Sequence, residues 1–228
     1  MKLHIFNPEH DIALAANQER FTAPHAGRRL RTDLGFIPAF WASEGDMVLV
    51  DDVEAAIEAR RHLSKFGKDV VFVTYADLKA FAFEDVESFQ VDPWGWDRTI
   101  KEQLLRANSN LQSFMPSDDT LAAIREMSSR RFAAEHLLPL LREAGEEKTV
   151  GEARYCTTME KVKLTMAQNG KSVLKSPWSS SGRGVRYVET AAPDAHLEGW
   201  AANVVKRQGG IMVEPLYNKV YDFGLEFF

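Results

Sequence analysis

The sequence has little cysteine, no block of basic residues and no long hydrophobic run, and each absence excludes a class of protein. Cys156 is the only cysteine among 228 residues, so no internal disulfide can form, which suits a reducing compartment. The formal net charge is −5 and no lysine- and arginine-rich cluster stands out, so nothing indicates nonspecific binding to nucleic acid or an anionic membrane. No apolar run approaches the roughly 18 residues of a membrane-spanning helix.

The first residues also lack the apolar core of a signal peptide. Polar and charged side chains at Asn7, Glu9, His10 and Asp11 interrupt the N-terminal segment. Hydrophobic residues make up 45% of the chain and charged residues 27%, proportions that are ordinary for a globular protein. We therefore expect a cytoplasmic protein with one large or two small domains.

The first third of the chain alternates short apolar runs with an amphipathic stretch. Residues 2–6 read KLHIF, a short strand candidate, and residues 47–50 and 70–73 read MVLV and VVFV, which are β-branched runs typical of buried strands. Between the last two runs, residues 53–67 have helical spacing and end at Gly67. Strand, helix and strand joined by short links predict a parallel α/β unit.

The second half of the chain predicts a different mixture of helices and strands. A helix is expected from Ser117 or Asp118, punctuated by Pro139 and Gly145 at its end. The pattern that follows is a helix over 157–170, a strand over 171–175, a polar loop, a strand over 185–188 and a helix over 194–210. Two strand-like runs, 211–218 and 220–228, complete an α+β region.

The polar loop after Lys175 has the composition of a phosphate-binding turn. Gly182 and Gly184 permit positive φ and a close backbone approach, the hydroxyls of residues 179–181 can donate hydrogen bonds, and Arg183 adds a forked donor. A lysine at the end of the preceding strand would supply a point charge. The same composition is also that of a mobile polar hairpin tip, so composition alone leaves both interpretations open.

The order of elements resembles the ATP-grasp superfamily. The resemblance rests on the helix, the strand ending in Lys175, the Ser/Gly loop, the returning strand, the next helix and the Val213-Glu214-Pro215 strand. It runs from Ser117 to the last residue, and the strand-rich part before it is similar to a pre-ATP-grasp domain. The resemblance implies an α/β chain with a parallel-sheet domain over 1–116 and an α+β lid subdomain over 117–228.

The resemblance also implies an ATP site and assigns its residues. Lys175 would reach the phosphates, the 179–184 loop would form the lid above them, and the Glu214 carboxylate would hold the adenosine. Main-chain groups of the next two residues would face the adenine edge, and Arg131 would replace a second lysine of the family. The nucleotide-binding residues implied are Lys175, Ser179, Ser180, Ser181, Gly182, Arg183, Gly184, Glu214, Pro215, Leu216 and Arg131.

The resemblance also implies magnesium, and we expect its ligands, an acidic residue and a downstream Glu-x-Asn pair, beyond residue 228, so no metal ligand is assigned in this chain. The chain stops inside a strand-like run, so we expect an N-terminal portion of a longer protein that is inactive alone.

Substrate contacts are expected at two places. Asn7, His10 and Asp11 follow the first strand, where ligands of α/β sheets tend to bind. The polar cluster continues with Arg20, His25, Arg28, Arg29 and Arg31, which as a substrate-recognition loop would suit an anionic acceptor. Asp222 and Glu226 share one face of the last predicted strand. Each of these residues could equally belong to a solvated surface or a helix cap.

The function that the resemblance implies is an ATP-dependent ligase joining a small-molecule carboxylate to an amine through an acylphosphate. Positioning and charge neutralisation dominate such chemistry, so no Ser-His-Asp triad is needed. Two alternatives remain open from the sequence: a nonenzymatic nucleotide-binding module, and an ATP-grasp phosphotransferase.

Overall fold

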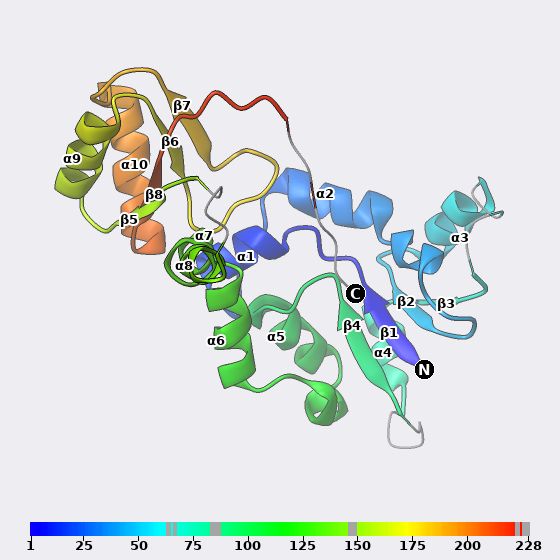
Figure 1. The fold of residues 1–228 in the computed structure, drawn as a ribbon. Coiled ribbons are helices and arrows are strands. Elements are labelled where there is room, and N and C mark those ends of the chain that lie inside the picture. The colour runs from blue at the N-terminus through cyan, green and yellow to red at the C-terminus, as the bar shows by residue number, and fades with distance from the viewer. Residues whose placement is uncertain (63–64, 66–67, 83–87, 146–149, 222–223, 225–228) are drawn as a thin grey trace. The chain divides into compact units, whose positions relative to one another are not determined.

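The computed structural model describes residues 1–62, 65, 68–82, 88–145, 150–221 and 224. The chain forms two compact units, Met1–Met127 and Ser128–Phe228, which are described one at a time (Figure 1). The first unit therefore includes the helix after residue 117. The domain boundary that the sequence predicts, between residues 116 and 117, precedes that helix.

The first unit is built on a four-stranded parallel sheet with the order β3-β2-β1-β4. Its strands are β1 (Lys2–Ile5), β2 (Met47–Leu49), β3 (Val71–Val73) and β4 (Gln90–Pro93). The three apolar runs of the sequence supply β1, β2 and β3, which confirms the predicted parallel unit. The fourth strand was not predicted, because its sequence QVDP places only Val91 in the core and ends in proline.

Helices cover both faces of this sheet. They are α1 (His10–Ala16), α2 (His25–Leu34), η1 (Ile37–Phe40), α3 (Val53–His62), α4 (Tyr75–Ala80), α5 (Arg98–Ala107), η2 (Ser109–Phe114) and α6 (Asp118–Met127). Met47 and Leu49 of β2 pack in one core cluster with α4 and α5, whereas Val48 packs in another with η1 and α3. Burial on both faces explains why the strands read as unbroken apolar runs. The predicted helix end at Gly67 lies outside the described residues.

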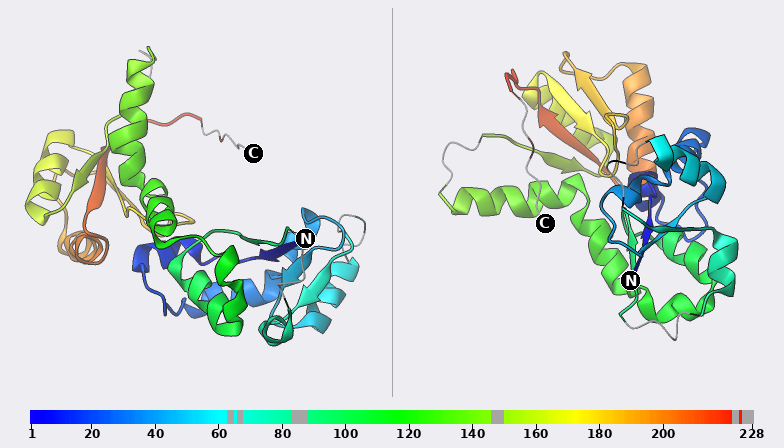
Figure 2. Two further views of the ribbon diagram at one scale, coloured as in Figure 1. Left: turned by 90° about the horizontal axis from the view of Figure 1, so that it is seen from below. Right: turned by 90° about the vertical axis from the view of Figure 1, so that its right-hand side faces the viewer.

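The second unit contains a four-stranded antiparallel sheet with the order β5-β8-β6-β7. Its strands are β5 (Arg154–Cys156), β6 (Ser172–Lys175), β7 (Val185–Val188) and β8 (Ile211–Pro215). Helices α9 (Met159–Asn169) and α10 (Ala195–Gln208) cover one face of the sheet (Figure 2). The chain is therefore an α/β protein with a parallel-sheet unit followed by an α+β unit, as the sequence predicted.

Local signals set the ends of these elements. Thr158 and Asp194 accept hydrogen bonds from the third residue of α9 and of α10, and glycines with positive φ follow both helices. The helix predicted from Ser117 is divided, because Ser129 caps a new segment, α7 (Arg130–Phe132), continued by η3 (Ala133–Leu137) and α8 (Leu138–Glu143). After β8, residues 216–221 form no strand, and most of the predicted strand over 220–228 lies outside the described residues.

Candidate functional site

Two of the predicted nucleotide-binding residues form an ion pair on the second unit's sheet. Lys175 lies opposite Met212 of β8, and Glu214 lies opposite Val173 of β6, so both side chains project from the same face. Lys175 Nζ lies 2.5 Å from Glu214 Oε2, although 39 residues separate the two in the sequence. The side chains are 30% and 22% exposed, so the pair is open to solvent on one side.

The face that carries this pair is opposite to the face covered by α9 and α10. Leu174 and Val213, whose side chains alternate with Lys175 and Glu214, belong to the core cluster beneath the helices. Tyr155 of β5 pairs with Met212 and lies on the Lys175 face, and the Arg131 guanidinium sits 4.9 Å from the centre of its ring. Lys175, Glu214 and Arg131 therefore occupy one face of the sheet. Arg131 is also held by Glu135 at 2.7 Å.

The loop between β6 and β7 is closed by its own backbone. Ser176 N–H donates to the Gly184 carbonyl at 2.8 Å, and Val185 N–H donates to the Gly182 carbonyl at 3.1 Å. Ser181 and Gly182 adopt left-handed conformations, with φ of 52° and 70°. A Cβ atom on Gly184 would lie 2.3 Å from Ser179 Oγ, so this position requires glycine.

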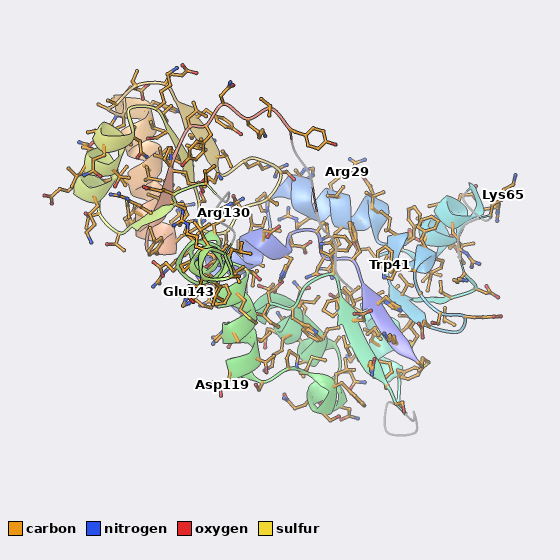
Figure 3. The ribbon with its side chains drawn as sticks, viewed as in Figure 1. Arg29, Trp41, Lys65, Asp119, Arg130 and Glu143 are labelled. Carbon is orange, nitrogen blue, oxygen red and sulfur yellow. The ribbon has the colours of Figure 1, made fainter. Side chains whose placement is uncertain are left out.

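Arg130 fixes the base of this loop, which the sequence did not reveal. Its Nη1 donates to the Ser176 carbonyl at 2.6 Å and to Ser179 Oγ at 2.9 Å, and its Nη2 donates to the Ser179 carbonyl at 3.1 Å. Figure 3 labels Arg130 among the side chains of the chain. In the sequence, Arg130 cannot be distinguished from any other charged residue in the first turn of a helix.

A second anchor comes from the end of α10. Trp178 N–H donates to Gln208 Oε1 at 3.0 Å, and Gln208 Nε2 donates to the Trp178 carbonyl at 3.2 Å. Trp178 is buried, whereas Ser181, Gly182 and Arg183 are exposed. The loop therefore combines a fixed base with an accessible tip.

The segment after β8 has fewer free main-chain donors than the sequence prediction assumed. Pro215 has no N–H group, and Leu216 N–H donates to the Lys171 carbonyl at 3.0 Å. A contact with an adenine edge from these two residues would have to use their carbonyl oxygens. Asp222 and Glu226, predicted to contact substrate, lie outside the described residues.

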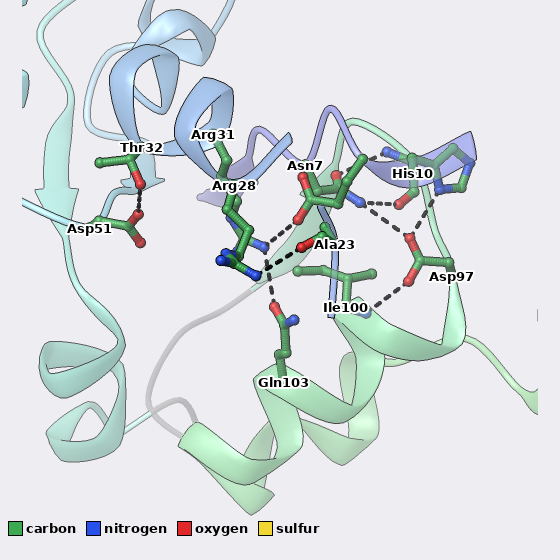
Figure 4. Close-up of polar contacts among 12 residues, drawn as sticks. Asn7, His10, Ala23, Arg28, Arg31, Thr32, Asp51, Asp97, Ile100 and Gln103 are labelled. Atoms are coloured by element: carbon green, nitrogen blue, oxygen red, sulfur yellow. Dashed lines mark hydrogen bonds and ion pairs between the residues drawn. The ribbon is translucent and has the colours of Figure 1, made fainter. Parts of the chain in front are cut away.

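In the first unit, Asn7 and His10 come together with Asp97 at the carboxyl ends of β1 and β4 (Figure 4). Asn7 exchanges hydrogen bonds with the Gly95 backbone at 2.8 and 3.3 Å, and His10 Nδ1 lies 3.1 Å from Asp97 Oδ2. Asp97 also caps α5 through the N–H of Ile100. The polar atoms of Asn7 and His10 therefore join two loops of the fold, while Asp11 lies in the first turn of α1.

Beside these loops lies a pocket of about 470 Å³ within the first unit. Polar residues of its wall include Glu9, Arg28, Arg31, Asp51, Tyr75 and Gln103. The sequence pointed to the two arginines as part of a polar cluster. It gave no signal for Asp51, Tyr75 or Gln103, which follow different strands or lie on α5.

Arg31 is the centre of a buried network in the pocket wall. It donates to Glu9 Oε1 at 3.0 Å, to Gln103 Oε1 at 3.2 Å and to the Tyr75 hydroxyl at 2.6 Å. Burial alone would lower the pKa of Arg31, but the Tyr75 oxygen and the Glu9 carboxylate outweigh it, so this pKa is raised. Burial raises the pKa of Tyr75 against the opposing Arg31 charge. At neutral pH the arginine is charged and the phenol is neutral.

Among the described residues, no group of three or more His, Cys, Asp or Glu could hold a metal ion. No helix formed by these residues is long and apolar enough to cross a membrane.

Comparison with known proteins found matches only among solved structures. No family model and no curated protein matches the chain. A RimK domain ATP-grasp protein from Sphaerobacter thermophilus DSM 20745 is 23% identical, with a TM-score of 0.37 over 76% of this chain. The ATP-grasp ligase PsnB, complexed with the precursor peptide PsnA2 and AMPPNP, is 14% identical, with a TM-score of 0.31 over 77%. The chain spans 64% of the length of each, and both are ATP-grasp proteins, the superfamily that the sequence resembles.

Proposed function

We propose that the second unit binds ATP on the Lys175 face of its sheet, and that the chain is part of an ATP-dependent carboxylate–amine ligase. The observation that carries the proposal is the Lys175–Glu214 pair, which lies on the sheet face opposite to α9 and α10, at the end of the strand that leads into the Ser/Gly loop. A half-exposed ammonium held by one carboxylate can exchange that partner for a phosphate oxygen.

The loop would contribute through its backbone and hydroxyls. Its fixed base holds residues 176–179, and its exposed tip carries Ser181, Gly182 and Arg183. Positive φ at Ser181 and Gly182 lets the backbone of the tip approach an anion closely. Together with Arg131 on the same sheet face, these groups would neutralise the charge of a triphosphate.

Glu214 would change its role when the nucleotide binds. Once Lys175 moves to a phosphate, the Glu214 carboxylate would accept hydrogen bonds from ribose hydroxyls, and the carbonyls of Pro215 and Leu216 would accept from an adenine amine. The ion pair would therefore hold both side chains in place before ATP arrives.

The reaction would run in two steps. A substrate carboxylate attacks the γ-phosphorus of ATP, which gives an acylphosphate and ADP, and an amine then attacks the acyl carbon and displaces phosphate. Lys175 would orient the triphosphate and stabilise the charge transferred to the leaving oxygens. Neither step is routed through a metal here, because the described residues include no group of three or more His, Cys, Asp or Glu that could hold one.

Isothermal calorimetry with ATP on the full chain tests this proposal. We expect Lys175→Ala to weaken binding by roughly 10- to 100-fold, the value of a charge-assisted hydrogen bond. Lys171→Ala is the matched control, because Lys171 lies on the same strand hairpin but pairs with the exposed Glu189 at 2.7 Å.

The control should bind ATP within about twofold of the unaltered chain. Equal affinities for the two variants would refute the assignment of Lys175. ATP binding without formation of ADP in the presence of carboxylates and amines would instead favour a nucleotide-binding module.

A further inference from the structure

The pocket of the first unit lies where three adjacent parallel strands end. Glu9 follows β1, Asp51 follows β2 and Tyr75 follows β3, while Arg28 and Arg31 come from α2. Ligands of α/β proteins bind outside the carboxyl ends of such strands. The volume of about 470 Å³ suits a small molecule.

The crevice next to it, between the loops after β1 and β4, is filled by protein groups. Asn7 is hydrogen-bonded there to Gly95 and to Asp97, and the His10 ring packs so closely that a Cβ on Gly95 would lie 2.3 Å from it. The open space for a ligand is therefore the neighbouring pocket (Figure 4).

Four charged side chains line the pocket, and two of them neutralise each other. Glu9 and Arg31 are paired at 3.0 Å with side chains only 10% and 14% exposed. The remaining donors of Arg31 are directed to Gln103 and Tyr75. This pair forms part of the wall and contributes no net charge to a ligand.

The other two charges have no ionic partner among the residues that the structure describes. Arg28 donates through Nη1 to the Ala23 carbonyl at 2.9 Å. The other N–H groups of its planar guanidinium could donate to a ligand. Asp51 accepts from the Thr32 hydroxyl through Oδ2 at 2.5 Å, which leaves Oδ1. In Figure 4 the side chains of Arg28 and Asp51 are not joined by any contact. One pocket thus offers a positive and a negative group that do not neutralise each other.

The wall also contains an acceptor that needs a donor. Glu9 Oε2 is buried and has no hydrogen-bond partner among the described residues. A buried carboxylate oxygen without a donor costs free energy. Phe21, Ala23 and the Tyr75 ring line the same pocket and offer apolar surface to the rest of a ligand.

We propose that this pocket binds a small zwitterion, a molecule with both a free ammonium and a free carboxylate group, such as an amino acid or a short peptide. Arg28 would hold the carboxylate in a bidentate fork, and Asp51 would hold the ammonium. The inference names the substrate class of the proposed ligase and rests on that function only for the chemistry that follows binding.

Ligand titrations of the full chain without nucleotide test the proposal. The probes are the free L-amino acids and their dipeptides, followed by chemical-shift changes or calorimetry, and then the N-acetyl and C-amide derivatives of the best binder. We expect at least one zwitterion to bind at millimolar or lower concentration and each capped derivative to lose at least tenfold in affinity. Tighter binding of dipeptides than of free amino acids would identify a peptide as the ligand that supplies the ammonium and carboxylate groups.

Variants separate the two ends of the ligand. Arg28→Met and Asp51→Asn should each weaken binding at least tenfold, and Arg28→Lys should recover part of the loss because it keeps the charge without the fork. Arg29→Met is the matched control, since Arg29 lies one residue away on α2 and pairs with Asp33 in solvent. Unchanged melting temperatures would show that each variant is folded.

Three results would overturn the inference: no binding of any probe, unweakened binding of N-acetyl amino acids, or equal loss in the Arg29 control. Lys175→Ala should leave zwitterion binding intact. If the unaltered chain binds a zwitterion but not ATP, the proposed ATP site has failed. If it binds ATP but no zwitterion, the proposed zwitterion site has failed.

Discussion

The two units each contain a prominent pair of opposite charges, and the pairs differ in how they are held. Arg31 in the first unit is bonded to Glu9, Gln103 and Tyr75 and is almost covered by protein. Lys175 in the second unit has the single carboxylate of Glu214 and stands partly in water. Both pairs join residues far apart in the sequence, yet only Lys175 can leave its carboxylate partner at a small cost in free energy.

Burial and the number of partners account for this difference. A buried charge that loses its partner cannot be solvated, so the first pair is fixed once the unit folds. A partly exposed pair is weak because water competes for both ions. A solvent-open pair next to an accessible loop tip is suited to ligand exchange, whereas a buried pair is suited to shaping a pocket.

The largest effect should come from breaking the buried pair. Arg31→Met leaves the Glu9 carboxylate uncompensated in a covered site and should destabilise the first unit by about 3–5 kcal/mol. Denaturant unfolding followed by hydrogen exchange of the β1–β3 amides measures the change. The unfolding free energy of the exposed Arg29→Met control should stay within about 0.5 kcal/mol of the unaltered chain. A loss of stability below about 1 kcal/mol for Arg31→Met would remove the contrast between the two units.

An intermediate effect is expected at another buried carboxylate of the first unit. Asp46 accepts hydrogen bonds from the N–H groups of Lys2 and Ser43 at 2.8 and 2.9 Å, and its Oδ2 lies 3.0 Å from His4 Nε2. Burial alone would raise the pKa of Asp46, but these contacts together lower it below 3.8. Asp46→Asn should cost about 1–3 kcal/mol near neutral pH.

The pH dependence of this cost has a defined sign. Because the folded pKa lies below the unfolded one, the ionised carboxylate stabilises the protein above the ordinary value of 3.8. That stabilisation is lost as the pH falls through the folded pKa, so the unfolding free energies of Asp46→Asn and the unaltered chain should converge in acid. A difference that stays constant down to about pH 2 would contradict the assignment.

The smallest effect should come from the exposed pair. A double-mutant cycle with Lys175→Met and Glu214→Gln should give a coupling energy of about 0.2–1 kcal/mol for unfolding of the second unit. Hydrogen exchange of the β6 and β8 amides in the four proteins measures it. A coupling above about 3 kcal/mol would make the pair structural, like that of Arg31, and would weaken the case for ligand exchange.

The sequence predicted β1, β2 and β3, because β2 and β3 are continuous apolar runs and β1 carries the buried Leu3 and Ile5. It could not predict β4, whose alternate residues point away from the core. Lys175 and Glu214 were predicted from their positions along the chain, but their contact depends on the register between β6 and β8. The pocket wall escaped prediction because its residues come from separate elements and form no local pattern.

Arg130 and Arg131 are neighbours with separate tasks, since one clamps the loop base and the other lies over Tyr155. Successive residues of a helix point about 100° apart, so this division depends on the rotational phase of α7. Insertion of one residue between Arg130 and Arg131 would turn one guanidinium by about 100° relative to the other, so at most one of them could keep its present target. The loop base and the Tyr155 ring are therefore coupled through the spacing of two neighbouring residues.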